Sequence, residues 1–531
     1  MIFVFLGMNK KIGQFILLSL LLSLAFCLRT YHIGHFSLFG DEKQSVMLAV
    51  GNTNLGGMPP WMAADSTFTP ARFWEPRGIS SWLAADAAGD VSGNSLFHDL
   101  SLKFASIFSK SDASFRLVSV FFNLSTLLVI FYWARKVRKK YLWVYAVLLL
   151  AVIEPFFIIY SQQARNYTTS LFFTTLCNYY FYLIVFENPK SKYYLLWALA
   201  ALGALFSTYL TALVLIGQAI FLLHKKASLL FWKHFIGYAL LFLIPFVAWM
   251  TLGPGKYFLI YQADAAEQYR NFLQVNGPIP GWIEPTNATN LYKKAVSILS
   301  DQFFWTNDLY HKYGFKLGGL LFVAFVVGLF NWLRLVEKRE RDFYVFGLIQ
   351  LVIPVVVLTL AAINAQTTTG FFLRYASFGL PFGIFISVGF ADYIWRQAIW
   401  IKILGLFWVV MQLISIIGQF TPIYSDKPQK YTFSHDRVAN PYPIIAKKIK
   451  ENYQLGDTLW IPSSNANFLK TDTLKALGPD VKDAQLINLY LEPSDPILER
   501  INLVYKDSVL IKKKNGKLLL IFDFQNGKYR Y

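Results

Sequence analysis

The chain has little charge and almost no cysteine, and each shortage excludes a class of protein. Only 15% of its 531 residues are charged, whereas soluble domains carry about 25%. The two cysteines, Cys27 and Cys177, both lie in apolar segments. They provide no disulfide framework, no CxxC redox motif and no cysteine-rich metal site. An ordinary soluble enzyme and a disulfide-rich secreted domain are therefore both excluded.

Apolar residues take the place of the missing charge. Hydrophobic residues make up 55% of the sequence and aromatic residues 18%, and the mean hydropathy is +0.41. This composition predicts a polytopic α-helical membrane protein. Acidic residues are also scarce beside basic ones, 31 against 50, which gives a net charge of +19. The basic residues cluster in short loops between apolar runs, as the positive-inside rule describes. We therefore expect a membrane and no nucleic acid as the partner.

The apolar runs predict about eleven transmembrane helices within residues 1–420, because one span needs about 20 apolar residues. Lys10-Lys11 precede the first run. We interpret this run as a retained span, since no small-residue cleavage site follows it. With Lys10-Lys11 in the cytoplasm, every later basic cluster falls inside, and two loops, about 29–114 and 252–314, lie outside. The count depends on splitting the run 194–223 into two short spans.

The composition changes after Thr421, where apolar runs become short and the charges are mixed. Residues 421–531 are expected to form a small extracytoplasmic α/β domain without a catalytic motif. The elements predicted there are a helix at Pro443 to Tyr453, strands at Thr458–Ile461, Ala484–Leu491, Ser508–Lys513 and Lys517–Phe524, and a turn at Asn515-Gly516.

Two adjacent carboxylates, Asp41-Glu42, follow the first span. Carboxylates at a membrane face are costly to hold beside hydrocarbon, so they are functional candidates. The alternative is a helix N-cap, because acids favour a helix start. On the same predicted outer face lie Gln162 and Arg165, after the third span, and Arg374, which opens the tenth. An acid can accept the proton of an acceptor hydroxyl, and an arginine can bind a departing phosphate. The combination suits transfer of a sugar from a polyprenyl phosphate.

Five sequence elements in a fixed order resemble those of the type C glycosyltransferases, in particular the protein O-mannosyltransferase and lipid A aminoarabinose transferase group. The resemblance covers residues 12–223 and, more loosely, 370–395. It implies the type C glycosyltransferase fold and an inverting membrane enzyme. The donor would be a polyprenyl-phosphate-linked sugar, and the acceptor a hydroxyl of a lipid, glycan or protein on the extracytoplasmic face. The five elements are Asp41-Glu42, Asn94 to His98, Arg116 to Ser119, Ser161 to Tyr167, and Arg374-Tyr375 followed by Pro381.

The resemblance also implies roles for single residues. Asp41 would be the base, and Glu42 would support it or help to hold a divalent metal ion, which stays open as a cofactor. Four residues would surround the lipid phosphate: Arg165, Arg374, Gln162 and Tyr167. The implied location is the plasma membrane, which is the inner membrane of a Gram-negative cell, with the active site outside.

Several alternatives remain open on the sequence. The whole chain could be a flippase for lipid-linked sugars without chemistry, or an assembly subunit whose outer domain is the working part. Arg165 and Arg374 could be snorkelling interfacial arginines, and Tyr167 could belong to an interfacial aromatic belt. His32 and His35 could ligate a metal with Asp41.

Two further segments also allow two readings. Glu154, beside Pro155 in the third span, could cap backbone groups that the proline frees, or it could line the donor cavity. The apolar residues between Leu96 and Phe108 recur at helical spacing. They predict a helix in the membrane interface or a short soluble helix packed on its own loop.

Overall fold

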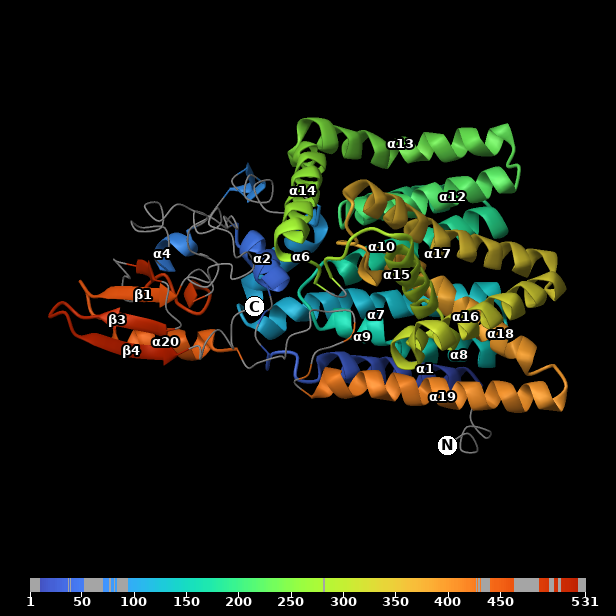
Figure 1. Ribbon diagram of the computed structural model, residues 1–531. Coiled ribbons are helices and arrows are strands. Elements are labelled where there is room, and N and C mark those ends of the chain that lie inside the picture. Colours follow the sequence, from blue (N-terminus) through green and yellow to red (C-terminus); the bar gives the residue numbers. More distant parts are fainter. Residues whose placement is uncertain are drawn as a thin grey trace.

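The computed structural model describes residues 10–36, 38, 40–51, 70–75, 78–80, 82–83, 94–279, 282–425, 427, 430, 440–462, 487–495, 501–504 and 508–523. Figure 1 shows a bundle of long helices with a small sheet domain at one end. The first and last long helices of the bundle lie side by side along one of its edges (Figure 1).

Eight helices among the described residues are long and apolar enough to cross a membrane, and the chain is a multi-pass membrane protein. They are α1 (Lys10–Thr30), α7 (Asp112–Val137), α10 (Tyr167–Phe186), α13 (Leu229–Leu252), α16 (Leu309–Leu335), α17 (Lys338–Ala365), α18 (Leu380–Ile394), which η6 (Ser377–Gly379) precedes, and α19 (Ile399–Tyr424).

The third predicted span is broken. It consists of α8 (Tyr141–Val152) and α9 (Pro155–Ser161), which meet at an angle of 49°. Proline has no N–H group to continue a helix, so the backbone must change direction before Pro155. Glu154 occupies the N-cap position of α9, and its Oε2 accepts a hydrogen bond of 2.8 Å from the Phe157 N–H. The capping alternative for Glu154 is thus the one that the structure shows.

Arg29, near the end of α1, stabilises the other side of this break. Its guanidinium is fully buried and donates to the carbonyl of Val152 at 3.1 Å and to Asn123 Oδ1 at 2.6 Å. The last carbonyls of a helix have no partner within the helix. A cation at this end also interacts favourably with the helix dipole. Arg29 therefore supplies hydrogen bonds that α8 loses where it stops.

The run 194–223 forms two short helices, α11 (Ser191–Leu205) and α12 (Ala212–His224), with the 3₁₀ turn η2 (Tyr209–Thr211) between them. The predicted split is therefore present in the structure. Each helix is shorter than the roughly 20 residues that a span needs, so the count of eleven spans stays a prediction.

Shorter elements gather at the end of the bundle next to the sheet domain, where Figure 1 shows α2, α6 and α14. On α6, Phe104, Ile107 and Phe108 are 63%, 73% and 75% exposed, while His98 and Leu102 are buried. An apolar face this exposed suits the membrane interface better than a helix packed on its own loop.

The bounds of the remaining shorter elements in the described part of the bundle, wherever they lie, are α2 (Gly40–Ala49), α4 (Pro70–Phe73), α6 (Leu96–Phe108), η3 (Pro254–Tyr257), α14 (Phe258–Asn276), α15 (Ala288–Asp301), η4 (Phe304–Thr306) and η5 (Leu373–Tyr375).

The opposite end of the bundle carries the basic clusters that the sequence places in the cytoplasm. There Arg138, just after α7, donates to Glu340 Oε1 at 2.9 Å and to Asp392 Oδ2 at 3.0 Å. The two acceptors belong to α17 and α18, so one arginine joins three helices.

The sheet domain contains α20 (Tyr442–Asn452) and a four-stranded sheet in the order β2-β1-β3-β4. The pair β1–β2 is parallel, and β1–β3 and β3–β4 are antiparallel. Gly516 has φ +83° between β3 and β4, as an Asn-Gly turn requires. The predicted helix and three of the predicted strands are therefore confirmed. The strands are β1 (Thr458–Pro462), β2 (Ile501–Val504), β3 (Ser508–Lys512) and β4 (Leu518–Asp523).

The prediction of a strand at Ala484–Leu491 is wrong over its described part. Residues 487–491 form a helical turn, with the Tyr490 N–H bonded to the carbonyl of Ile487 at 3.1 Å. Ile487, Leu489 and Leu491 are buried, so every second residue is apolar, as in a half-buried strand. Strand β2 was not predicted from the sequence.

A buried hydrophobic cluster connects the sheet domain to the adjacent end of the bundle. It contains Val46 and Met47 from α2, Phe115 from α7, Ile445 from α20 and Leu459 from β1. Helix α2 thus lies between the two parts of the molecule and contributes to the core that they share.

Candidate active site

Asp41 lies in the first turn of α2, not at its N-cap, and its side chain is 29% exposed. Its Oδ2 is 3.9 Å from Arg165 Nη2 and 3.7 Å from Arg374 Nη1. Arg165 follows α9 and Arg374 is in η5, so three distant parts of the sequence meet at this carboxylate. Both distances exceed the 2.7–2.9 Å or so of a direct ionic hydrogen bond. The Asp41 carboxylate therefore lies near two cations, at distances longer than a direct hydrogen bond to either.

Arg165 is held in place by α2 and α7. Its Nη1 donates to the carbonyl of Asp41 and to Ser45 Oγ, both at 2.9 Å. Ser119 Oγ donates to the Arg165 carbonyl at 3.3 Å. Burial acts to lower the pKa of Arg165, but the Asp41 carboxylate and Tyr167 together raise it by more, so the net shift is upward. Arg165 is therefore a permanent cation in a fixed position.

Arg374 is surrounded by aromatic rings. Its guanidinium carbon lies 5.0 Å from the ring centre of Tyr375, 5.1 Å from that of Phe372 and 5.8 Å from that of Tyr167. The Arg165 guanidinium is also 5.8 Å from the Tyr167 ring. Aromatic faces attract cations at such distances. Tyr167 is therefore within cation–π distance of both arginines.

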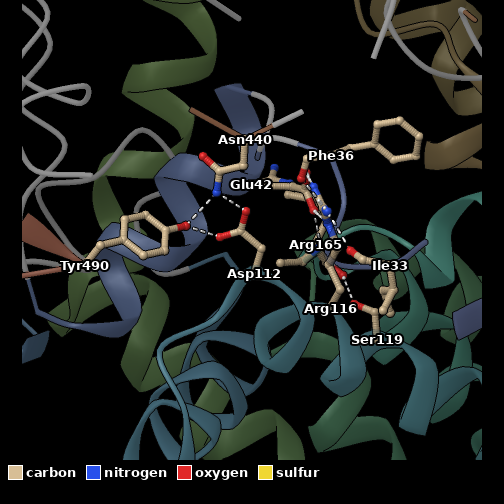
Figure 2. Close-up of polar contacts among 10 residues, drawn as sticks. Ile33, Phe36, Glu42, Asp112, Arg116, Ser119, Arg165, Asn440 and Tyr490 are labelled. Carbon is tan, nitrogen blue, oxygen red and sulfur yellow. Dashed lines mark hydrogen bonds and ion pairs between the residues drawn. The ribbon is translucent and has the colours of Figure 1, made fainter. Parts of the chain in front are cut away.

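Glu42 is engaged in a buried ion pair. Arg116 donates from Nε and Nη2 to the two oxygens of Glu42, each at 2.8 Å, and Figure 2 shows this paired geometry. The backbone N–H of Ala164 donates to Glu42 Oε1 at 2.7 Å. Arg116 Nη1 also donates to the carbonyls of Ile33 at 2.7 Å and Phe36 at 2.9 Å (Figure 2). Glu42 thus fixes α2 against α7 and against the backbone next to Arg165, which agrees with a supporting role beside Asp41.

Gln162 is placed differently from the other candidates. Its side chain is 2% exposed, and its Nε2 lies 3.3 Å from the carbonyl of Leu28 and 3.4 Å from that of Tyr31. These contacts join the segment between α9 and α10 to the end of α1. Gln162 therefore positions the segment that carries Arg165.

The element Asn94 to His98 holds the start of α6. Asn94 Oδ1 accepts from the Tyr209 N–H at 2.6 Å, and the Phe97 N–H donates to the carbonyl of Phe206 at 3.0 Å. Burial, and then the charge of Arg165, lower the pKa of His98 to about 3, so this imidazole is neutral. The element connects α6 to the α11–α12 turn and places a neutral ring near Arg165.

Sequence reasoning missed one part of the surroundings of the site. Asp112, at the start of α7, accepts hydrogen bonds from Asn440 Nδ2 and from the Tyr490 hydroxyl, as Figure 2 shows. The sequence signal for this group was a carboxylate just before a long apolar run. Its partners could not be predicted, because they are more than 300 residues away in the chain.

The arrangement offers one partly exposed carboxylate, two arginines and an aromatic ring near both arginines. It can accept a proton and bind an anion in one place. Within the described ranges, no three His, Cys, Asp or Glu side chains gather as metal ligands would. His32 and His35 therefore do not form a ligand cluster with Asp41.

The chain is similar to one known protein family and to solved structures of one other protein. Residues 100–251 match the family described as dolichyl-phosphate-mannose-protein mannosyltransferase. The apo crystal structure of ArnT from Cupriavidus metallidurans aligns with a TM-score of 0.50 at 11% identity, over 91% of this chain and 76% of that one. The structure of the same protein bound to undecaprenyl phosphate aligns with a TM-score of 0.48 at 10% identity, over the same shares. A search of curated proteins gives no significant match.

The chain shares the fold of ArnT. The family match covers part of the chain, which includes α7, α10 and the segment with Arg165. Both findings agree with the membrane glycosyltransferase that the sequence elements suggest.

Proposed function

We propose that this protein transfers one sugar from a polyprenyl-phosphate donor to an acceptor hydroxyl on the extracytoplasmic face of the plasma membrane, with inversion at the anomeric carbon. The observation that carries the proposal is the meeting of Asp41 with Arg165 and Arg374, 3.9 and 3.7 Å from its carboxylate. A base and a paired cation site at one membrane face are what this reaction needs.

In the proposed step, Asp41 accepts the proton of the acceptor hydroxyl as its oxygen bonds to the anomeric carbon. The bond from that carbon to the phosphate oxygen breaks, and its electron pair leaves with the polyprenyl phosphate. Arg165 and Arg374 bind the phosphate and stabilise the charge that develops on it. Because the attack comes from the face opposite the leaving group, the sugar configuration inverts.

Several observations support the assignment of the two arginines to the phosphate. Their side chains are only 11% and 14% exposed, so a charge between them is shielded from water. The Tyr167 ring is equally distant from both guanidinium carbons and would orient them. The match to a family described by its dolichyl-phosphate-mannose donor agrees with a lipid-phosphate-linked sugar.

The test is to replace each arginine with lysine, which keeps the charge but loses the planar fork of donors. We expect Arg165→Lys and Arg374→Lys each to weaken binding of polyprenyl phosphate about tenfold or more, since bidentate ionic hydrogen bonds are lost. Binding is measured on purified protein, and sugar transfer in membranes at matched protein level. Arg334→Lys, an exposed residue at the end of α16, is the matched control.

Unchanged affinity in both Arg165→Lys and Arg374→Lys would remove the anion site from the mechanism. If the protein moved the donor across the membrane without releasing sugar, it would be a flippase, and the proposal would fail.

A further inference from the structure

Helix α2 turns three consecutive side chains toward three different parts of the molecule. Asp41 faces the two arginines, Glu42 pairs with Arg116 of α7, and the next residue, Lys43, faces the sheet domain. Successive residues of a helix are about 100° apart around its axis, so these three directions span more than half of its circumference. The position of Asp41 therefore depends on what α2 touches on its other sides.

Lys43 makes the first connection to the sheet domain. Its side chain is buried, and Nζ donates to the Tyr442 hydroxyl at 3.0 Å and lies 5.3 Å from the centre of that ring. Tyr442 is the first residue of α20 and is also buried. Burying an ammonium group is costly unless it is paired, so this contact resists any displacement of α20 from α2.

A second connection runs through α7. Asn440 and Tyr490, both in the sheet domain, donate to the two oxygens of Asp112, and the Asn440 amide lies 2.7 Å from the Tyr490 hydroxyl. Asp112 is one helical turn before Arg116, so the two side chains lie on one face of α7. Arg116 in turn holds Glu42, next to Asp41. Figure 2 shows the contacts of Asp112 with Tyr490 and Asn440, and Arg116 nearby on the same helix.

The apolar side of α2 joins the same two partners. Val46 and Met47 belong to one buried cluster with Ile445, Leu459 and Ile511 of the sheet domain. A domain that only covered the active site would not need to share its core with the helix that carries the base.

We propose that the sheet domain is a positioning element of the active site, which holds α2, and through it Asp41, in the geometry for proton transfer. This inference rests on the proposed function of Asp41. Tyr442 and Tyr490 are the positioning residues, and they act through Lys43 and Asp112 without touching substrate.

The experiment uses the full-length protein with the double substitution Tyr442→Phe and Tyr490→Phe. Each change removes one hydroxyl and keeps the ring in the core. Tyr453→Phe is the control, because the Tyr453 hydroxyl donates to the carbonyl of Asp457 at 2.8 Å wholly inside the sheet domain. Three quantities are measured: the saturated rate of sugar transfer, the affinity for polyprenyl phosphate, and amide hydrogen exchange in residues 43–49.

We expect the double variant to transfer sugar roughly 5- to 100-fold more slowly at saturating donor, because misplacement of a reacting group by about 1 Å can cost a factor near 10². Donor affinity should fall less than the transfer rate, because Arg165 keeps its charge when its contacts with α2 loosen and Arg374 belongs to η5, outside α2. Exchange in 43–49 should accelerate, and Tyr453→Phe should alter none of the three.

Faster exchange with an unchanged transfer rate would overturn the inference, and so would an equal loss of rate in Tyr453→Phe. Failure of the proposed function is recognised separately. In that case Asp41→Asn itself would transfer sugar normally, whatever the exchange in α2.

Discussion

Replacing Asp41 with asparagine distinguishes a catalytic base from a carboxylate that only favours a helix start. Asparagine has the same shape, and in the first turn of α2 the substitution removes only a favourable interaction with the helix dipole, about 0.3–1 kcal/mol. The Asp41 side chain is 29% exposed, so the new amide can hydrogen-bond to water. We expect Asp41→Asn to fold and insert normally and sugar transfer to fall by about 10²–10⁴-fold, the usual effect of losing a general base.

The same substitution should strengthen donor binding, because Asp41 repels the phosphate that the arginines attract. Its carboxylate is 3.7–3.9 Å from their nitrogens, so a phosphate held roughly 3 Å beyond them would lie about 7 Å away. At that distance the repulsion is about 0.6 kcal/mol in water-like surroundings and about 2.4 kcal/mol at an effective dielectric constant near 20. The dissociation constant should fall by roughly 3- to 50-fold. The smaller value is favoured, since the site is partly exposed and screened.

The assay follows sugar release from a radiolabelled polyprenyl-phosphate donor in membranes, together with polyprenyl phosphate binding to purified protein. Asp264→Asn, an exposed position on α14, is the matched control. Near-normal turnover by Asp41→Asn would reject the base and favour a flippase. Slower transfer with weaker donor binding would also refute the reasoning, because it would mean that Asp41 serves mainly to hold the arginines.

Other variants test the surroundings of the site. Glu42→Gln should reduce the amount of folded protein in detergent, because breaking its buried pair with Arg116 costs about 3–5 kcal/mol; a stable and active variant would show that the pair is dispensable. In a cysteine-free background, a cysteine at Asn515 should react with impermeant probes from outside and one at Lys139 should not, and the reverse pattern would invert the topology. The pKa of His98 is lowered to about 3 in the fold, so below about pH 6.5 the unfolded chain binds a proton that the folded one excludes. Lowering the pH from 7 to 5 should therefore cost about 2 kcal/mol of stability, measured by thermal unfolding, and His98→Gln should lose this dependence.

Much of the bundle could be predicted because the bilayer restricts what can cross it. Long apolar runs bounded by basic loops correspond to α1, α7, α10, α13 and α19. The residues of the site were also readable, since carboxylates and arginines at a membrane face are rare enough to stand out. Their meeting around Asp41 is a structural finding, and their roles remain proposals.

What the sequence could not show depends on contacts between distant segments. Glu42 and Arg116 are 74 residues apart, and nothing local to either indicates the pair. Hydropathy averaged along the third span does not reveal the break at Glu154, because the residues on both sides are apolar. The function of the sheet domain was likewise out of reach, as its buried contacts with α2 join residues about 400 positions apart.

The contacts of Arg29 have a consequence for how the protein enters the membrane. Arg29 is in the last turn of α1, and a long cationic side chain near a helix end can reach the membrane interface. In an isolated α1 this guanidinium would therefore turn toward water. In the assembled protein, its donors meet Asn123 of α7 and the carbonyl of Val152. Helix α1 thus turns this cation inward, away from water, only when α7 and α8 have packed beside it.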